Sequence, residues 1–137
     1  MKRKATAVWN GTIKEGGGHL TTQSTTLDKT QYSFKSRFED GVGTNPEELM
    51  AAAHAGCFTM KLSADLTAAG FVPDTLETTC TITLEAGTIT NSELVTIAKV
   101  PGIDDKQFQT IAAGAKAGCP VSKAYNMEIS LQATLKD

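Results

Sequence analysis

The chain has 137 residues and a formal net charge of −2, so it is long enough for one core and lacks the basic excess of a nucleic-acid-binding protein. No stretch approaches the roughly eighteen apolar residues of a membrane-spanning helix, and the first residues lack the apolar segment of a signal peptide. We therefore expect one cytoplasmic domain over residues 1–137, with no nucleic-acid or membrane partner and with three reduced cysteines.

Strand and turn patterns come first along the chain. Residues 5–12 are rich in side chains that favour strands, the glycines of residues 15–18 indicate a tight turn, and residues 19–26 complete a hairpin. These glycines do not open a helix, so a turn is favoured over a phosphate-binding loop. In residues 31–38, three aromatic side chains and a serine alternate with polar ones, which predicts a third strand.

The longest helical pattern covers residues 44–69 and predicts a buried central helix. Asn45 can cap it, Pro46 suits its first position, and Glu48 stands where it can close a capping box. Small residues at its centre allow another backbone to approach closely, and Gly70 ends it. The predicted buried stripe consists of residues at helical spacing, with Met50 and Cys57 on its flank: Leu49, Ala53, Met60 and Ala64.

The second half of the chain predicts three strands and one helix. Residues 76–84 and residues 93–100 carry strand patterns. A helix over residues 104–117 follows, capped by one of the two aspartates at its start. Residues 127–135 alternate apolar and polar side chains most regularly and predict the last strand.

The predicted order of elements is β-β-β-α-β-β-α-β. This order indicates an α+β domain in which two main helices lie on a largely antiparallel sheet. The central helix is too apolar for one sheet to cover it. We therefore expect an intertwined homodimer whose subunits share helices and sheet.

Two cysteines lie at positions that packing alone does not explain well. Cys57 is in mid-helix among small residues, whereas Cys119 lies on an irregular bend, because a residue before proline avoids helical geometry. A fixed thiol and a loosely held thiol can form a redox pair, and the alternative is that both are ordinary buried cysteines. Cys80 is expected to be a small core residue on its strand.

A thiol with an ordinary pKa of about 8.5 needs a nearby positive charge to ionise near pH 7. The start of the central helix is about three turns from Cys57, beyond the reach of the helix dipole. Of the two arginines, Arg3 is close to the terminus and Arg37 lies on the predicted strand before the helix. Arg37 is therefore the candidate cation, and a solvated arginine on a strand face is the alternative.

His54 lies three residues before Cys57 and raises the alternatives of a Cys/His hydrolase or a metal site. No Cys-x-x-Cys or His-x-x-x-His spacing and no third ligand supports a metal. We expect a packed or hydrogen-bonded histidine, and we expect no metal and no other cofactor.

Four stretches of the chain resemble the motifs of a known family, the osmotically inducible protein C family, which includes the organic hydroperoxide resistance proteins. They are residues 44–49 (TNPEEL), residues 52–58 (AAHAGCF), residues 100–103 (VPGI) and residues 115–122 (AKAGCPVS). The resemblance runs essentially from end to end. It implies a thiol peroxidase that reduces organic hydroperoxides in oxidative and osmotic stress defence, as an intertwined homodimer with active sites between its subunits.

Position by position, the resemblance implies a role for four residues. Cys57 matches the peroxidatic cysteine that is oxidised to sulfenic acid, and Cys119 matches the resolving cysteine that forms a disulfide with it. Glu47 matches the carboxylate that orients the active-site arginine, and Arg37 fits the arginine of the osmotically inducible subgroup. The resemblance also implies an external dithiol reductant of lipoyl type.

The other subgroup takes its arginine from an earlier loop, which in this chain is the glycine run of residues 16–18. That difference favours the osmotically inducible subgroup. Glu47 and Cys57 are ten residues apart, which is about 15 Å along a straight helix, so they cannot meet within one helix. If both residues serve one site, either Arg37 bridges the gap or, as we expect, the central helices of two subunits pack antiparallel, each lending its first turn to the other's Cys57.

Two functions of other classes stay open. One is a stress-induced protein that binds a small lipophilic ligand in an interfacial apolar pocket. The other is a redox sensor that signals through a Cys57–Cys119 disulfide without turnover. If the chain is a peroxidase, apolar neighbours such as Phe38, Phe58 and Met60 favour an alkyl or lipid hydroperoxide over hydrogen peroxide.

Overall fold

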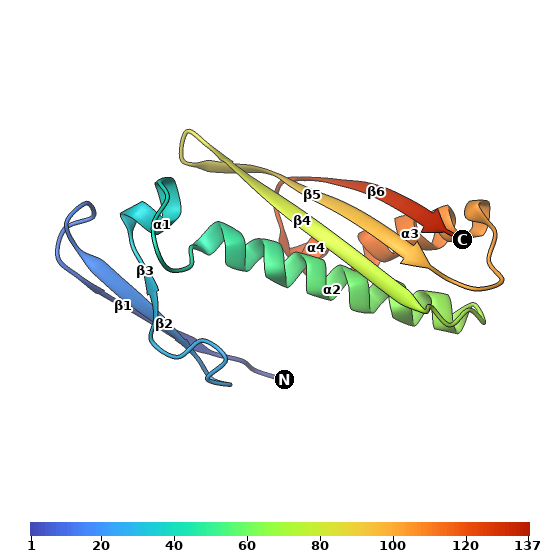
Figure 1. The fold of residues 1–137 in the computed structure, drawn as a ribbon, viewed down its shortest axis with the longest axis horizontal. Helices are drawn as coiled ribbons and strands as arrows, with labels where there is room; N and C mark the ends of the chain where they lie inside the picture. The colour runs from blue at the N-terminus through green and yellow to red at the C-terminus, as the bar shows by residue number, and fades with distance from the viewer. The chain divides into compact units, whose positions relative to one another are not determined.

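The computed structural model describes all 137 residues and divides into two compact units, Met1–Leu49 and Met50–Asp137. Each unit is described by itself (Figure 1). The elements in chain order are β1 (Ala5–Asn10), β2 (Gly17–Thr22), β3 (Thr30–Tyr32), α1 (Phe34–Phe38), α2 (Pro46–Ala68), β4 (Thr75–Glu85), β5 (Thr88–Lys99), α3 (Asp105–Gly118), α4 (Pro120–Ala124) and β6 (Glu128–Lys136).

The first unit contains an antiparallel sheet with the strand order β1-β2-β3. The predicted hairpin is confirmed, since β1 pairs with β2 from Ala5 opposite Thr22 to Asn10 opposite Gly17. Gly18 is required within β2, because a Cβ at this position would lie 2.3 Å from the carbonyl oxygen of Val8.

The predicted third strand over residues 31–38 is wrong beyond Tyr32, where β3 ends and the short helix α1 follows. Ser33 is the reason. Its hydroxyl accepts the backbone N–H of Ser36 at 3.2 Å, and the hydroxyl of Ser36 accepts the backbone N–H of Ser33 at 2.8 Å. This reciprocal capping box starts a helix where alternation predicted a strand. Arg37 therefore lies on a helix and not on a strand face.

Helix α2 begins as its sequence predicts. Pro46 is its first residue, and the side chain of Asn45 accepts the backbone N–H of Glu48 at 2.7 Å. The carboxylate of Glu48 accepts the hydroxyl of Thr44 at 2.8 Å, so only half of the expected capping box is formed. Gly70, with a φ of +91°, ends the helix as expected.

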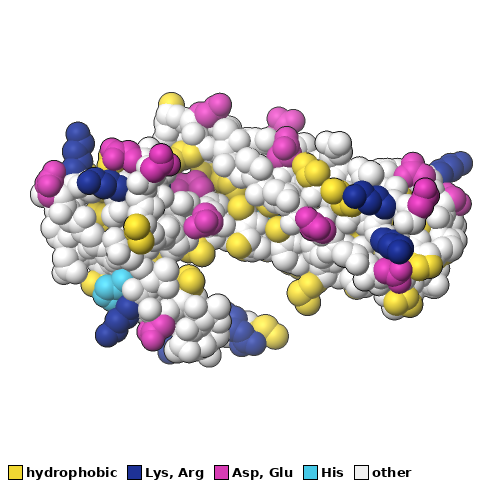
Figure 2. Space-filling view, viewed as in Figure 1, with side chains coloured by type: hydrophobic (Ala, Val, Ile, Leu, Met, Phe, Trp, Pro, Cys, Tyr) yellow, Lys and Arg dark blue, Asp and Glu magenta, His cyan; other side chains and the backbone are white.

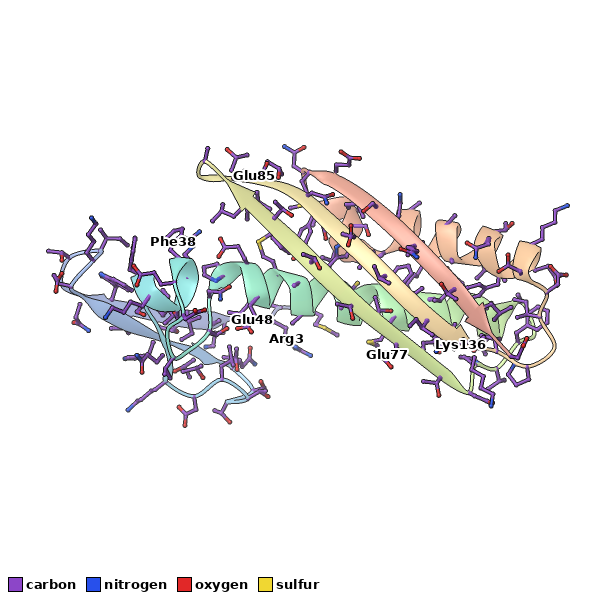
Figure 3. All side chains as sticks on the ribbon, turned by 45° about the horizontal axis from the view of Figure 1, so that its top comes forward. Arg3, Phe38, Glu48, Glu77, Glu85 and Lys136 are labelled. Carbon is purple, nitrogen blue, oxygen red and sulfur yellow. The ribbon has the colours of Figure 1, made fainter.

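The second unit contains a sheet with the strand order β4-β5-β6. Strands β4 and β5 form an antiparallel hairpin, with Glu85 at its tip in Figure 3. Strand β6 pairs with β5 in parallel, because α3 and α4 carry the chain back between them. The α+β class and the two long helices are confirmed, whereas the helices α1 and α4, the second sheet and the parallel pair were not predicted.

The core of the second unit lies between this sheet and two helices, α2 and α3, on the same face of it (Figure 1). Strand β5 contributes Leu94 and Ala98, which are almost fully buried. The fully buried side chains of the helices are His54, Phe58, Leu62 and Leu66 on α2, and Phe108, Ala112 and Ala115 on α3. Asp104 caps α3 by accepting the N–H of Gln107 at 2.9 Å.

The buried stripe predicted for α2 is wrong. Ala53 and Ala64 are exposed, and the side chain of Met60 is 76% exposed. Small and apolar residues occupy several faces of this helix, so periodicity alone did not identify the face that the bulkier Phe58 and Leu62 turn toward the sheet.

No helix is both long and apolar enough to cross a membrane. On the face seen in Figure 2, basic and acidic side chains are interspersed.

Candidate active site

The second unit brings the two predicted redox cysteines together. Cys57 lies on α2 beside the buried Phe58, and Cys119 is the single residue between α3 and α4. As Pro120 predicts, the backbone of Cys119 is extended, with φ −61° and ψ 125°. Both thiols are free, and they lie close enough for each to shift the pKa of the other. Cys119 is fully buried, whereas Cys57 is partly exposed.

The surroundings of the two thiols differ. Burial raises the pKa of Cys57, the backbone N–H of Val121 partly offsets this rise, and the neighbouring Cys119 raises the pKa further. Burial also opposes ionisation of Cys119, but the backbone N–H of Ser122, the thiol of Cys57 and the hydroxyl of Ser122 outweigh it and lower its pKa. Within this unit, nothing cationic lowers the pKa of Cys57.

His54 is fully buried one turn before Cys57 and is held on both ring nitrogens. Its Nδ1 lies 2.6 Å from the hydroxyl of Ser92 on β5, and its Nε2 lies 2.8 Å from the hydroxyl of Ser122 on α4. The ring of Tyr125 packs edge-on against it at 5.1 Å between centroids. The expectation of a hydrogen-bonded histidine is confirmed, and burial lowers the pKa of His54.

Cys80 lies on the inward face of β4, as its alternation predicts. Its sulfur is 3.3 Å from the hydroxyl of Ser92 and 4.0 Å from Nδ1 of His54. Burial raises the pKa of Cys80, so this thiol stays protonated. No group of three or more His, Cys, Asp and Glu side chains is arranged to hold a metal ion.

The first unit brings the other two predicted site residues together. Arg37 on α1 forms a forked ion pair with Glu47 in the first turn of α2, with Nη2 at 2.7 Å and Nε at 3.2 Å from carboxylate oxygens. The hydrogen bond between them raises the pKa of Arg37 and lowers the pKa of Glu47, so both stay charged. The guanidinium also lies over the ring of Phe38, 5.1 Å from its centroid.

Sequence reasoning missed Ser92 and Ser122 as neighbours of this chemistry. Ser122 lies three positions after Cys119, which is the spacing at which a residue in a helical first turn faces its cap. That spacing could have indicated Ser122 as a neighbour of Cys119. Ser92 lies on the inward face of β5, which also carries the buried hydroxyl of Thr96, and a buried serine on a strand carries no specific sequence signal.

The family of the chain follows from comparison with known proteins. The model of a family described as OsmC-like protein matches residues 38–134, which include Cys57 and Cys119. The chain belongs to the OsmC-like family. It is 47% identical to a protein of Escherichia coli (strain K12) named peroxiredoxin OsmC, over 99% of this chain and 98% of that protein. A protein of Shigella flexneri with the same name matches equally well.

Solved structures support the fold of this OsmC-like chain. An OsmC-like protein from Mycoplasma pneumoniae superposes with a TM-score of 0.79 at 13% identity, covering 100% of this chain and 99% of that one. The organic hydroperoxide resistance protein OhrB of Bacillus subtilis superposes with a TM-score of 0.65 at 22% identity, covering 97% and 98%. The predicted family is confirmed, and so is the enzyme class, a cysteine-based peroxidase.

Proposed function

We propose that this chain reduces organic hydroperoxides to alcohols through a Cys57 sulfenic acid and a Cys57–Cys119 disulfide. The observation that carries the proposal is that two free thiols from distant parts of the sequence lie next to each other in the folded unit. An ordinary pair of buried cysteines has no need of groups that lower the pKa of one thiol, as those around Cys119 do.

In the first step, the Cys57 thiolate attacks the peroxide oxygen distal to the organic group. A sulfur–oxygen bond forms, the oxygen–oxygen bond breaks, and the alkoxide takes up a proton and leaves as the alcohol. The second unit by itself raises the pKa of Cys57, so this step needs a cation from elsewhere. Arg37 is the proposed source, because Glu47 fixes its guanidinium in a defined orientation.

An antiparallel homodimer is the proposed way in which the cation reaches the thiol. Glu47 and Cys57 lie on the same helix, about 15 Å apart along its axis, and in the proposed dimer a partner's α2 running the other way brings its first turn to Cys57. The free face of α2 suits such a contact. It carries small or flexible exposed residues at intervals of four positions: Ala52, Gly56, Met60 and Ala64.

Gly56 lies at the middle of this face. A Cβ added there would meet no atom within 4 Å, so the backbone of α2 is open to close approach by a second helix. We propose that the two units of each subunit act together as one functional domain of the dimer.

In the second step, Cys119 attacks the sulfur of oxidised Cys57, the disulfide forms and water leaves. An external dithiol, of lipoyl type by family resemblance, then reduces the disulfide and restores both thiols. The proposed compartment is the reducing cytoplasm, where such a dithiol is maintained. The proposed role is defence against peroxide stress.

An alkyl or lipid hydroperoxide is the proposed substrate. Phe38, 50% exposed, and Met60, 76% exposed, are available to contact an organic group. Phe58, which we expected to serve the same purpose, is fully buried in the core and is not available.

The test is consumption of cumene hydroperoxide and of hydrogen peroxide with dihydrolipoamide as the dithiol. The wild type is expected to turn over repeatedly and to prefer cumene hydroperoxide, whereas Cys57→Ser is expected to be inactive. Cys80→Ser is the matched control and is expected to keep wild-type activity. Equal consumption by wild type and Cys57→Ser would favour a ligand-binding protein, and a single oxidation without turnover would favour a redox sensor.

A further inference from the structure

A buried chain of hydrogen bonds leads away from Cys119 into the second unit. Ser122, three residues after Cys119, has a hydroxyl that helps to lower the pKa of the Cys119 thiol, and this hydroxyl lies 2.8 Å from Nε2 of His54. On the other side of the ring, Nδ1 lies 2.6 Å from the hydroxyl of Ser92, which in turn lies 3.3 Å from the sulfur of Cys80. Four elements, α2, α4, β5 and β4, therefore meet at one imidazole.

Packing alone does not account for this series of buried hydrogen bonds. His54 and Ser92 are both fully buried among apolar side chains, where an apolar pair would avoid the cost of desolvating polar groups. Each ring nitrogen has its own hydroxyl partner, so the network is satisfied and rigid. Tyr125 fixes the surroundings, since its ring packs on His54 and its hydroxyl donates to the backbone carbonyl of Met50 at 2.8 Å.

The order of donors and acceptors permits proton transfer. When Nδ1–H donates to Ser92, Nε2 accepts the hydroxyl hydrogen of Ser122, and the oxygen of Ser122 is free to accept the thiol hydrogen of Cys119. A shift of both hydrogens leaves a thiolate at Cys119 that accepts a hydrogen bond from Ser122. The hydroxyl of Ser122 and the backbone N–H groups of Val121 and Ser122 all stabilise the Cys119 thiolate.

We propose that Ser122 and His54 form a proton relay for the resolving thiol, in which His54 accepts the proton of Cys119 through Ser122 as Cys119 attacks oxidised Cys57. This inference rests on the proposed two-cysteine cycle and adds two residues to it. His54 acts through Ser122 and is therefore a positioning and proton-holding residue, not one that touches the substrate.

The step balances without any outside reagent. The hydrogen of Cys119 moves to the oxygen of Ser122 while the hydrogen of Ser122 moves to Nε2 of His54. The Cys119 thiolate forms the sulfur–sulfur bond, the sulfur–oxygen bond of the Cys57 sulfenic acid breaks, and hydroxide departs. The imidazolium returns one proton through the same hydroxyl, so the product beside the disulfide is water.

The surroundings of His54 suit a neutral acceptor. The titratable groups that face it are Cys80 from β4, Tyr125 after α4, and Cys119 through Ser122. No hydrogen bond or ion pair joins the ring to a carboxylate or a cation. Burial therefore keeps the ring unprotonated between transfers, which leaves Nε2 able to take up the thiol proton.

The test separates the two chemical steps after one equivalent of cumene hydroperoxide is added to reduced protein. Trapping with dimedone at short times measures formation of the sulfenic acid, and the loss of free thiol measures formation of the disulfide. His54→Gln and Ser122→Ala are expected to form the sulfenic acid normally and to form the disulfide at least about tenfold more slowly. The rate of disulfide formation in both variants is expected to rise more steeply with pH, because the proton must then leave to solvent base.

Two further variants keep the proposal testable. Ser122→Thr retains the hydroxyl and is expected to restore disulfide formation to within about threefold of wild type. Thr96→Val removes another fully buried hydroxyl from β5, one that bonds Thr78 and Glu77 but not His54, and is expected to leave both rates unchanged.

Three outcomes would overturn the relay. One is wild-type disulfide formation in folded Ser122→Ala, a second is a Thr96→Val variant as slow as His54→Gln, and the third is a Ser122→Thr variant as slow as Ser122→Ala. A wild-type protein that forms no disulfide at all would instead refute the proposed two-cysteine cycle on which the relay depends.

Discussion

The thiol pair and the ion pair are held in opposite ways. Cys57 and Cys119 come from elements far apart in the sequence and meet in the packed interior of the second unit. Arg37 and Glu47 are ten residues apart and meet at the surface of the first unit, where the side chain of Arg37 is 37% exposed. A half-exposed ion pair contributes only about 0–1 kcal/mol to stability.

The difference indicates where each pair gains its function. The fold of one unit is sufficient to bring the two sulfurs together, so in the proposed cycle the resolving step takes place within that unit. The ion pair adds little to stability, and its proposed role is to present an oriented guanidinium to the Cys57 thiolate. Variants that separate packing from charge test this distinction.

The largest expected effect is on the packing that holds the thiol pair. Phe58→Ala removes a fully buried side chain next to Cys57 and is expected to lower the free energy of unfolding by about 3–5 kcal/mol. Met60→Ala, on the exposed face of the same helix, is the control and is expected to change monomer stability by less than about 0.5 kcal/mol. Urea unfolding measures both, and equal losses would contradict the assignment of the buried face.

The second prediction removes the cation. Arg37→Ala is expected to lower kcat/KM for cumene hydroperoxide by about 100- to 1000-fold, because the developing charge loses its fixed donor. The free energy of unfolding is expected to change by at most about 1 kcal/mol. Lys35→Ala, an exposed cation on the same helix without an ion pair, is the control and is expected to retain activity. Loss of activity in both variants would show that damage to α1, and not the loss of the guanidinium of Arg37, lowers the rate.

A smaller effect is expected from the carboxylate that orients the cation. Glu47→Gln keeps the shape of the side chain but loses the charge that fixes Arg37, and activity is expected to fall about tenfold. Steady-state kinetics checks this value. An unchanged kcat/KM would show that the orientation of Arg37 comes from other contacts, such as the ring of Phe38.

The smallest expected effect is a pH dependence of stability. Burial lowers the pKa of His54 in the folded chain, so the unfolded chain binds this proton first as pH falls below its ordinary value of about 6.5. The contribution of His54 to the free energy of unfolding is therefore expected to be fully present above about pH 6.5 and to decrease as pH falls below this value. Urea unfolding of His54→Gln between pH 7.5 and 5 is expected to lack the decrease in free energy that His54 causes. A parallel decrease in both proteins would contradict it.

The sequence predicted those parts of the fold that local signals determine. The cap at Asn45, the end of α2 at Gly70 and the bend at Cys119 follow from the chemistry of single residues and are all present. Local alternation failed at Ser33, where two side-chain hydrogen bonds outweighed a strand pattern. The parallel pairing of β6 with β5 could not be predicted, because pairing direction depends on the path of the whole chain.

The residues of the candidate site also fall into those that the sequence predicted and those that only the tertiary structure reveals. Cys57 and Cys119 were predicted as a redox pair from their positions and from the resemblance, and Glu47 was expected to hold Arg37, with which it forms an ion pair. The hydroxyls of Ser92 and Ser122 were missed, since their importance arises only from contact with His54 across the core. Such contacts are properties of tertiary packing and leave little trace in one sequence.

The most direct measurement is the disulfide formed when the reduced chain receives one equivalent of cumene hydroperoxide. Proteolysis without reductant, followed by mass spectrometry, identifies the linked cysteines. The account predicts one Cys57–Cys119 disulfide within each chain, with Cys80 still a free thiol. Oxidation of Cys57 to sulfinic or sulfonic acid without a disulfide, or a disulfide that contains Cys80, would contradict it.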